Sequence, residues 1–204
     1  MSIYTLALFV HIVGAIGVFV GVSVWLFAAA ALRRTQYIWQ VRALTSLIQP
    51  SGNLAVGSML LLGAAGLYLA LTVWGWQTPW IDVATISFVL LAPFGARVID
   101  PRMRAMSRAA NEAPAGPLPP SLAVRIHDPI VGIGLHLYVA VLLGIVFLMT
   151  TKPALVASIL AMVVAAALGL ASGLPLWWAA RPRSRDIATR APSADQRGRG
   201  RPER

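Results

Sequence analysis

The sequence predicts an all-α fold, a polytopic transmembrane helical bundle of five spans. Three observations predict this fold class. Of the 204 residues, 58% are hydrophobic and only 12% are charged, whereas an average soluble domain carries about 25% charged residues. The segment from Ile3 to Leu32 contains no Asp, Glu, Lys or Arg, and an uncharged apolar run of about 18 residues or more is typical of a membrane span. The basic residues, finally, fall almost entirely into three clusters between and after such runs.

Turn-forming and charged residues divide the chain into a bundle, residues 1–176, and a tail. The predicted spans are 4–32, 53–73, 82–98, 130–149 and 154–176. The first span has no basic region before it and is too long for a signal peptide, so we expect a retained helix. Residues 177–204 are rich in Arg, Pro, Gly and Ser and poor in apolar residues, which predicts a disordered basic tail.

The connections between the spans carry recognisable boundary signals. Pro50-Ser51-Gly52 is expected to break the chain before the second span, and Pro93 to kink the third. Asp100-Pro101 has the pattern of an N-cap followed by proline at N1, which predicts a new polar helix to about residue 110. The same pattern recurs at Asp128-Pro129, before the fourth span. Residues 114–120 are proline-rich and are expected to form a linker, and residues 150–153 a tight turn.

The distribution of charge predicts the orientation. With five spans, 16 of the 17 basic residues lie on one side of the membrane and only Lys152 lies on the other. Cytoplasmic loops collect Lys and Arg, so we expect an outside N-terminus and a cytoplasmic C-terminus.

The tryptophans favour the same topology, because all except Trp25 fall near predicted span ends, where an indole has both apolar and wet surroundings. These are Trp74, Trp76 and Trp80 on the outer side and Trp39, Trp177 and Trp178 on the inner side.

Three stripes of small residues at helical spacing predict contact faces between helices, since helices in lipid associate by close backbone approach. The first span offers Gly14, Gly17 and Gly21. The fourth offers Gly132, His136, Ala140 and Gly144, and the fifth Ala157, Ala161, Ala165, Gly169 and Gly173.

Ionisable groups inside a membrane indicate functional sites, and the spans contain few. Asp82 and Arg97 lie at the two ends of the third span. His11 borders the glycine face of the first span and His136 lies on the small-residue stripe of the fourth, so both are expected to point inward. Histidines in helical bundles can ligate haem or a metal. At ~1.5 Å per residue the two histidines are separated by about 10–20 Å in depth, which disfavours one haem held by both. A neutral imidazole bonded to a neighbouring helix is the simpler alternative for each.

Other chemistry finds little support in the sequence. There is no cysteine, so thiolate metal sites are excluded, and no separate metal site or catalytic residue is predicted. No phosphate-binding glycine loop, His-Glu-x-x-His or Gly-x-Ser-x-Gly pattern is present. The net charge of +10 is explained by the cytoplasmic arginines, so no nucleic acid is expected as a partner, and the basic tail is expected to attract anionic lipid.

Two short motifs resemble those of a known family. The segments Leu8-Phe-Val-His11-Ile-Val-Gly14-Ala and Phe147-Leu-Met149-Thr-Thr-Lys152-Pro153 are similar to those of a bacterial family of predicted integral membrane proteins, domain of unknown function 2269. The resemblance covers about residues 6–153. It implies a multi-pass protein of the bacterial inner membrane. That family is in turn similar in outline to membrane proteins of the copper-resistance D type and to the haem-linked protoporphyrinogen oxidase of bacteria, which implies that His11 matches their first-helix histidine and that haem b or copper could be bound.

Three hypotheses for function follow. The first is a non-catalytic inner-membrane protein, either an accessory subunit or a small-solute-handling bundle, with partner membrane subunits or further copies of the chain left open. The second is a haem- or copper-binding redox protein that uses His11 or His136. The third is a transporter, which predicts a polar cavity along Asn53, Ser58, Thr85 and Ser87.

Overall fold

The computed structural model describes residues 2–75 and 77–180, and these are helical almost throughout. Five helical segments of this described part are long and apolar enough to cross a membrane. It contains no strand, and its one β-bridge joins Tyr37 to Pro117. The predicted all-α bundle of five spans is therefore confirmed. The predicted tail lies outside the described residues from residue 181 on.

The helices follow one another with short connections. They are α1 (Ile3–Leu32), α2 (Ile38–Thr45), α3 (Ile48–Leu69) with the π-helical turn η1 (Ala70–Trp74), α4 (Pro79–Phe94) with the π-helical turn η2 (Gly95–Ile99), α5 (Asp100–Glu112), α6 (Pro120–Ile126), α7 (Pro129–Thr151) and α8 (Leu155–Ala180).

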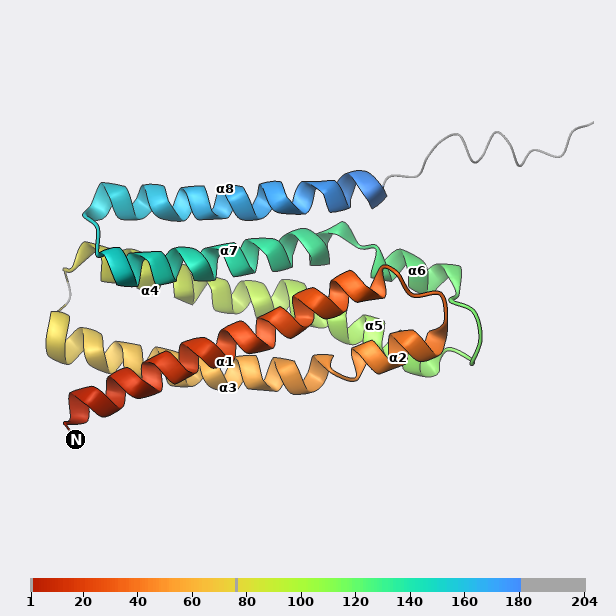
Figure 1. The fold of residues 1–204 in the computed structure, drawn as a ribbon, viewed down its shortest axis with the longest axis horizontal. Helices are drawn as coiled ribbons and strands as arrows, with labels where there is room; N and C mark the ends of the chain where they lie inside the picture. Colours follow the sequence, from red (N-terminus) through yellow and green to blue (C-terminus); the bar gives the residue numbers. More distant parts are fainter. Residues whose placement is uncertain (1, 76, 181–204) are drawn as a thin grey trace, which may run out of the picture.

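The five long helices lie side by side along one axis (Figure 1). The main helix pairs are α1 with α3 and α7 with α8, while α4 and α1 both contact α7. Helix α8 thus forms one edge of the bundle and the α1–α3 pair the other. The short helices α2, α5 and α6 gather at the end opposite the N-terminus (Figure 1). We call this end, which carries the arginines of the interhelical connections, the arginine-rich end.

Several helix ends form where the sequence predicts them. The carboxylate of Asp128 accepts a hydrogen bond of 2.9 Å from the backbone N–H of Ile130, and Pro129 occupies the first turn, as expected of an N-cap followed by proline. At the other end of α7, Lys152 adopts the left-handed conformation with φ 50°, which stops the helix and forms the predicted tight turn.

The predicted break at Pro50-Ser51-Gly52 is wrong, because α3 already begins at Ile48 and continues through these residues. Proline is tolerated in the first turn of a helix, where its missing N–H has no intrahelical partner. The indole N–H of Trp25 donates to the carbonyl of Ile48 at 3.0 Å, and its ring packs over Gly52. A tertiary contact from α1 therefore holds the first turn of α3 in place.

The predicted polar helix after Asp100 is present as α5, but the predicted N-cap at Asp100 is wrong. Asp100 is already helical, and α4, η2 and α5 form one continuous helical segment from Pro79 to Glu112. The carboxylate of Asp100 pairs with Arg104, 2.8 Å away, instead of capping a helix. The π-helical turn η2 lies between Pro93 and Pro101, each of which lacks the N–H that an α-helix uses, and the wider turn lets the helix continue past both.

A compact cluster of side chains fills the arginine-rich end. Its fully buried members include Leu32, Ile38, Val41, Ile99 and Met103, which come from α1, α2, η2 and α5. The proline-rich linker closes this end by pairing with the residues before α2. Here the N–H of Ile38 donates to Gly116 O at 3.1 Å, and that of Leu118 donates to Gln36 O at 2.8 Å.

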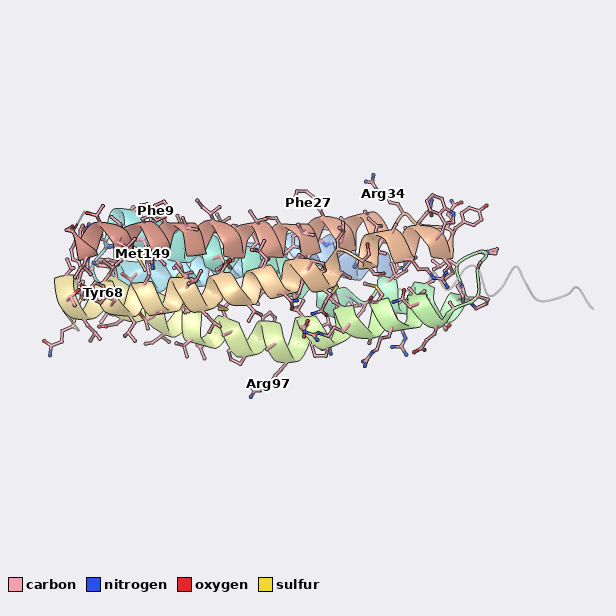
Figure 2. The ribbon with its side chains drawn as sticks, turned by 90° about the horizontal axis from the view of Figure 1, so that it is seen from below. Phe9, Phe27, Arg34, Tyr68, Arg97 and Met149 are labelled. Atoms are coloured by element: carbon pink, nitrogen blue, oxygen red, sulfur yellow. The ribbon has the colours of Figure 1, made fainter. Side chains whose placement is uncertain are left out.

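The outer surface of the long helices is apolar, as expected of a protein in lipid. Phe9 and Phe27 of α1 project outward (Figure 2) and are 60% and 72% exposed. Large exposed aliphatic side chains such as Val56, Leu60 and Leu168 cover the other spans. Such faces would be unstable in water, so this surface supports membrane insertion independently of the sequence pattern.

Candidate functional site

His11 lies on α1 and its ring packs against α3. Its Nδ1 is 3.1 Å from the carbonyl oxygen of Leu62, and because a carbonyl only accepts, Nδ1 donates a proton to it. The ring fits beside Gly66, where a Cβ atom would lie 2.9 Å from its Cε1 atom. Because Nδ1 carries the proton of the neutral imidazole, the lone pair lies on Nε2.

His136 bonds within its own helix. Its Nδ1 lies 2.8 Å from the carbonyl of Gly132 and donates to it, so here too Nε2 carries the lone pair. The ring is half-buried on the second turn of α7, near the arginine-rich end.

The structure does not bring the two histidines together. Val18 of α1 belongs to the same cluster as Tyr138 and Leu142 of the antiparallel α7, so these residues lie at one level. His11 lies seven residues before Val18, towards the N-terminal end, whereas His136 lies towards the other end. At ~1.5 Å per residue, they are about 15 Å apart along the bundle, which is too far for both to ligate one iron. No group of three or more His, Cys, Asp or Glu side chains that could hold a metal occurs among the described residues.

The glycines of the first span lie against α3. A Cβ added at Gly14 would lie 2.8 Å from the backbone N of Leu62, and one at Gly21 would lie 2.7 Å from Ser51 O. At Gly17 an added Cβ would collide with the Ser58 side chain. These three positions therefore permit the close approach of the two helices.

The small residues of the fourth and fifth spans lie between α7 and α8. Gly144 faces Ala165, with 2.9 Å between an added Cβ and the alanine Cβ, and Gly169 faces Ala140 at 2.8 Å. Gly173 packs on the backbone of Ile133, and Gly132 is buried in α7. Ala157, which we placed in the same stripe, is exposed, so it is not part of this contact face.

The four polar residues proposed to line a solute path are not brought together. Asn53 is exposed and accepts from the Gln49 side-chain amide. Ser58 is buried against Gly17 of α1, and the Ser87 hydroxyl donates to Val83 O in its own helix at 2.8 Å. Thr85 is half-buried on α4. The structure therefore offers no support for a polar cavity along these side chains.

Charged groups at the arginine-rich end were not predicted as a set. Asp128 not only caps α7 but also lies 3.4 Å from the Nε of Arg102. Burial lowers the pKa of the neighbouring Arg33 guanidinium, and the charge of Asp128 acts to raise it. The capping motif at Asp128 was visible in the sequence, but its partners come from other helices.

Comparison with known proteins agrees with the fold. The family described as "Predicted integral membrane protein (DUF2269)" matches residues 5–153 of the chain, which include the first four spans and His11. No curated protein and no solved structure matches the chain. Since the match covers well over half of the sequence, the chain belongs to this family of predicted integral membrane proteins.

Proposed function

We propose that the protein is a non-catalytic accessory subunit of the bacterial inner membrane, with its N-terminus outside. The observation that carries this proposal is the hydrogen bonding of the polar side chains within the spans. His11, His136 and Ser87 all donate to backbone carbonyls of the bundle. Proton and ion pathways depend on intramembrane ionisable groups that are free to act. Here His11 bonds to the neighbouring helix α3, and His136 and Ser87 bond within their own helices.

The charge distribution supports the orientation. The arginines of the connections lie at the end of the bundle that holds α2, α5 and α6, and Lys152 lies at the other. Lys152 is itself held there, because its Nζ lies 4.3 Å from the centre of the Trp74 ring. With the arginine-rich end in the cytoplasm, the chain follows the positive-inside rule, and the basic tail meets anionic lipid on that side.

The apolar outer faces support an accessory role. Helix α8 packs mainly on α7 and exposes residues such as Val156, Val164 and Leu168. Lipid can cover these side chains, and so can a partner membrane subunit or a second copy of the chain. In an accessory subunit, apolar faces of this kind pack against partner helices within the membrane.

A redox protein that binds haem at His11 is the second candidate. One observation favours it: the bond from Nδ1 to Leu62 O fixes the ring and leaves Nε2 as a metal ligand, which is the usual second-shell arrangement of a ligating histidine. The fit is incomplete, since His136 is at the wrong level and the ring edge packs closely on Gly66. A haem there would need a second ligand from another residue.

An absorption spectrum separates the two candidates. The full chain, purified in mild detergent, is expected to be colourless and free of bound metal by elemental analysis. A Soret band that disappears in His11→Ala but persists in His127→Ala would overturn the accessory proposal in favour of haem binding; His127 is an exposed histidine outside the spans and serves as the matched control.

The mass of the native assembly tests the accessory role itself. Native mass spectrometry of the chain extracted from its own membrane is expected to show a defined assembly larger than one chain. A lone chain, both in detergent and in native-lipid nanodiscs, would contradict the proposal.

A further inference from the structure

A groove opens at the arginine-rich end, between the last turn of α1 and the short helix α2. Its volume is about 610 Å³, which falls in the range of small-molecule sites, roughly 300–1,000 Å³. The end of α1 and helix α2 form its two walls, and the lining residues include Ala30, Ala31, Arg34, Trp39, Ala43 and Leu44. The alanines leave the space open, because larger side chains at these positions would fill it.

The groove lies on the lipid-facing side of α1. Arg34 projects from the same face as Phe27, away from the bundle (Figure 2), and the uncharged part of α1 ends at Leu32. The groove therefore lies where lipid hydrocarbon gives way to headgroups. Trp39, which is 67% exposed, fits this level, because indoles favour the membrane interface.

The polar side chains of the groove differ in their bonding partners. The Thr35 hydroxyl donates to Leu32 O at 2.7 Å, and the side-chain oxygen of Gln40 accepts from the backbone N–H groups of Gln36 and Tyr37. Arg34 is exposed, and the ion pairs found within residues 2–75 and 77–180 involve other arginines. The groove thus combines an apolar wall with a cationic donor that is available to an anion.

Arg34 differs in this respect from its neighbours along the chain. Arg42 donates to the carbonyls of Ala110 and Ala113, and Arg33 is half-buried near Asp128. Arg42 thus joins α2 to the end of α5, and Arg33 is partly covered by the protein. Arg34 is the arginine of this region whose guanidinium faces the groove and the lipid.

We propose that this groove binds one anionic phospholipid from the leaflet on the arginine-rich side. The phosphate accepts from the guanidinium of Arg34, and an acyl chain lies against Ala30, Ala31 and Leu44. Charge complementarity selects the anionic headgroup, and the apolar wall selects a lipid rather than a free anion. Such a bound lipid would differ from the diffuse attraction of the basic tail, because it occupies one defined place.

Lipid competition in native mass spectrometry tests this proposal. The purified full chain is equilibrated in mild detergent with equal amounts of phosphatidylglycerol and phosphatidylcholine. We expect the wild type to retain phosphatidylglycerol preferentially, and Arg34→Gln to lower that retention about fivefold, the ratio that corresponds to about 1 kcal/mol per arginine near a membrane surface. Arg97→Gln is the matched control, since Arg97 is also exposed but projects from the opposite face (Figure 2), and it should retain the lipid.

A second variant tests the groove without changing charge. Ala43→Leu keeps every arginine but reduces the open space, so it should also weaken retention of phosphatidylglycerol. Three results would overturn the proposal: equal retention of the two lipids by the wild type, an equal loss in Arg34→Gln and Arg97→Gln, or an unchanged affinity in Ala43→Leu. Circular dichroism of each variant verifies that its helices are intact.

Discussion

Single glycines set how closely α1 approaches α3. At Gly21 the missing side chain leaves room for the Ser51 carbonyl and the Ala55 Cβ, which would lie 2.7 and 2.8 Å from an added Cβ. Backbone and Cβ atoms cannot rotate away as a long side chain can. Gly57 of α3 is a natural contrast, because an added Cβ there meets nothing within 4 Å.

These two positions give opposite expectations for the same substitution. Gly21→Ala should lower the free energy of unfolding by about 1–3 kcal/mol, because the helices must separate to admit the methyl group. Gly57→Ala should be neutral or stabilising by up to about 1 kcal/mol, because alanine favours the helix. Thermal unfolding in mild detergent, followed by circular dichroism, compares them. Equal destabilisation by both would show that the contact face is not formed by Gly21.

Asp128 combines a helix cap with a weak ion pair, and its variants separate the two. Asp128→Ala removes the bond to the Ile130 N–H and should cost about 1 kcal/mol. Asp128→Asn keeps a good capping group but loses the charge that faces the partly exposed Arg102, and exposed pairs contribute little. We expect the Asn variant to unfold nearer to the wild type than the Ala variant does. The reverse order would assign the larger effect to the charge.

At the scale of elements, one side chain joins α2 to the end of α5. Arg42 of α2 donates to Ala110 O at 3.0 Å and to Ala113 O at 2.6 Å. These carbonyls lie at the end of α5, where backbone acceptors lack intrahelical partners. The planar guanidinium reaches both from one position, which a lysine ammonium cannot do.

Loss of this contact should loosen α2 and the linker together. Arg42→Lys is expected to cost about 1.5–3 kcal/mol, the usual range for hydrogen bonds to a charged group. Hydrogen exchange should quicken at residues 36–45 and 110–118, which are joined by Arg42 and by two backbone hydrogen bonds near Ile38. Arg108→Lys, at an exposed position of α5, should leave exchange at both segments unchanged. Unaltered exchange in Arg42→Lys would contradict this role.

The same elements explain how far the sequence could predict the structure. Local chemistry was sufficient at Asp128 and Lys152, where a capping carboxylate and a turn before proline act on their own helix. Local patterns gave the wrong helix boundary at Pro50 and Asp100. A contact from Trp25 holds the helix at Pro50, and a π-helical turn lets the helix continue into Asp100. The inward position of His11 follows from helical spacing, but its bond to Leu62 O and the groove beside Arg34 depend on how two helices meet.

At the scale of the whole molecule, the two ends of the bundle differ in charge. One end holds the short helices and the arginines of the connections, and the other holds Lys152, with its Nζ 4.3 Å from the centre of the Trp74 ring, and the packed pair Trp74 and Trp80, whose ring centroids are 5.4 Å apart. Because cytoplasmic loops collect Lys and Arg, a bundle whose ends differ in this way takes one orientation in the membrane. The depth of each histidine and the leaflet that supplies the proposed lipid both depend on this orientation.

Cysteine labelling measures the orientation directly, because the chain has no cysteine of its own. Single variants Ser2→Cys and Thr151→Cys place a thiol at the lysine end, and Ser46→Cys and Ser121→Cys place one at the arginine-rich end; all four positions are exposed. In right-side-out membrane vesicles, a membrane-impermeant maleimide should label the first two and reach the second two only after permeabilisation. Labelling of Ser46→Cys or Ser121→Cys in intact vesicles, with Ser2→Cys protected, would contradict the proposed topology.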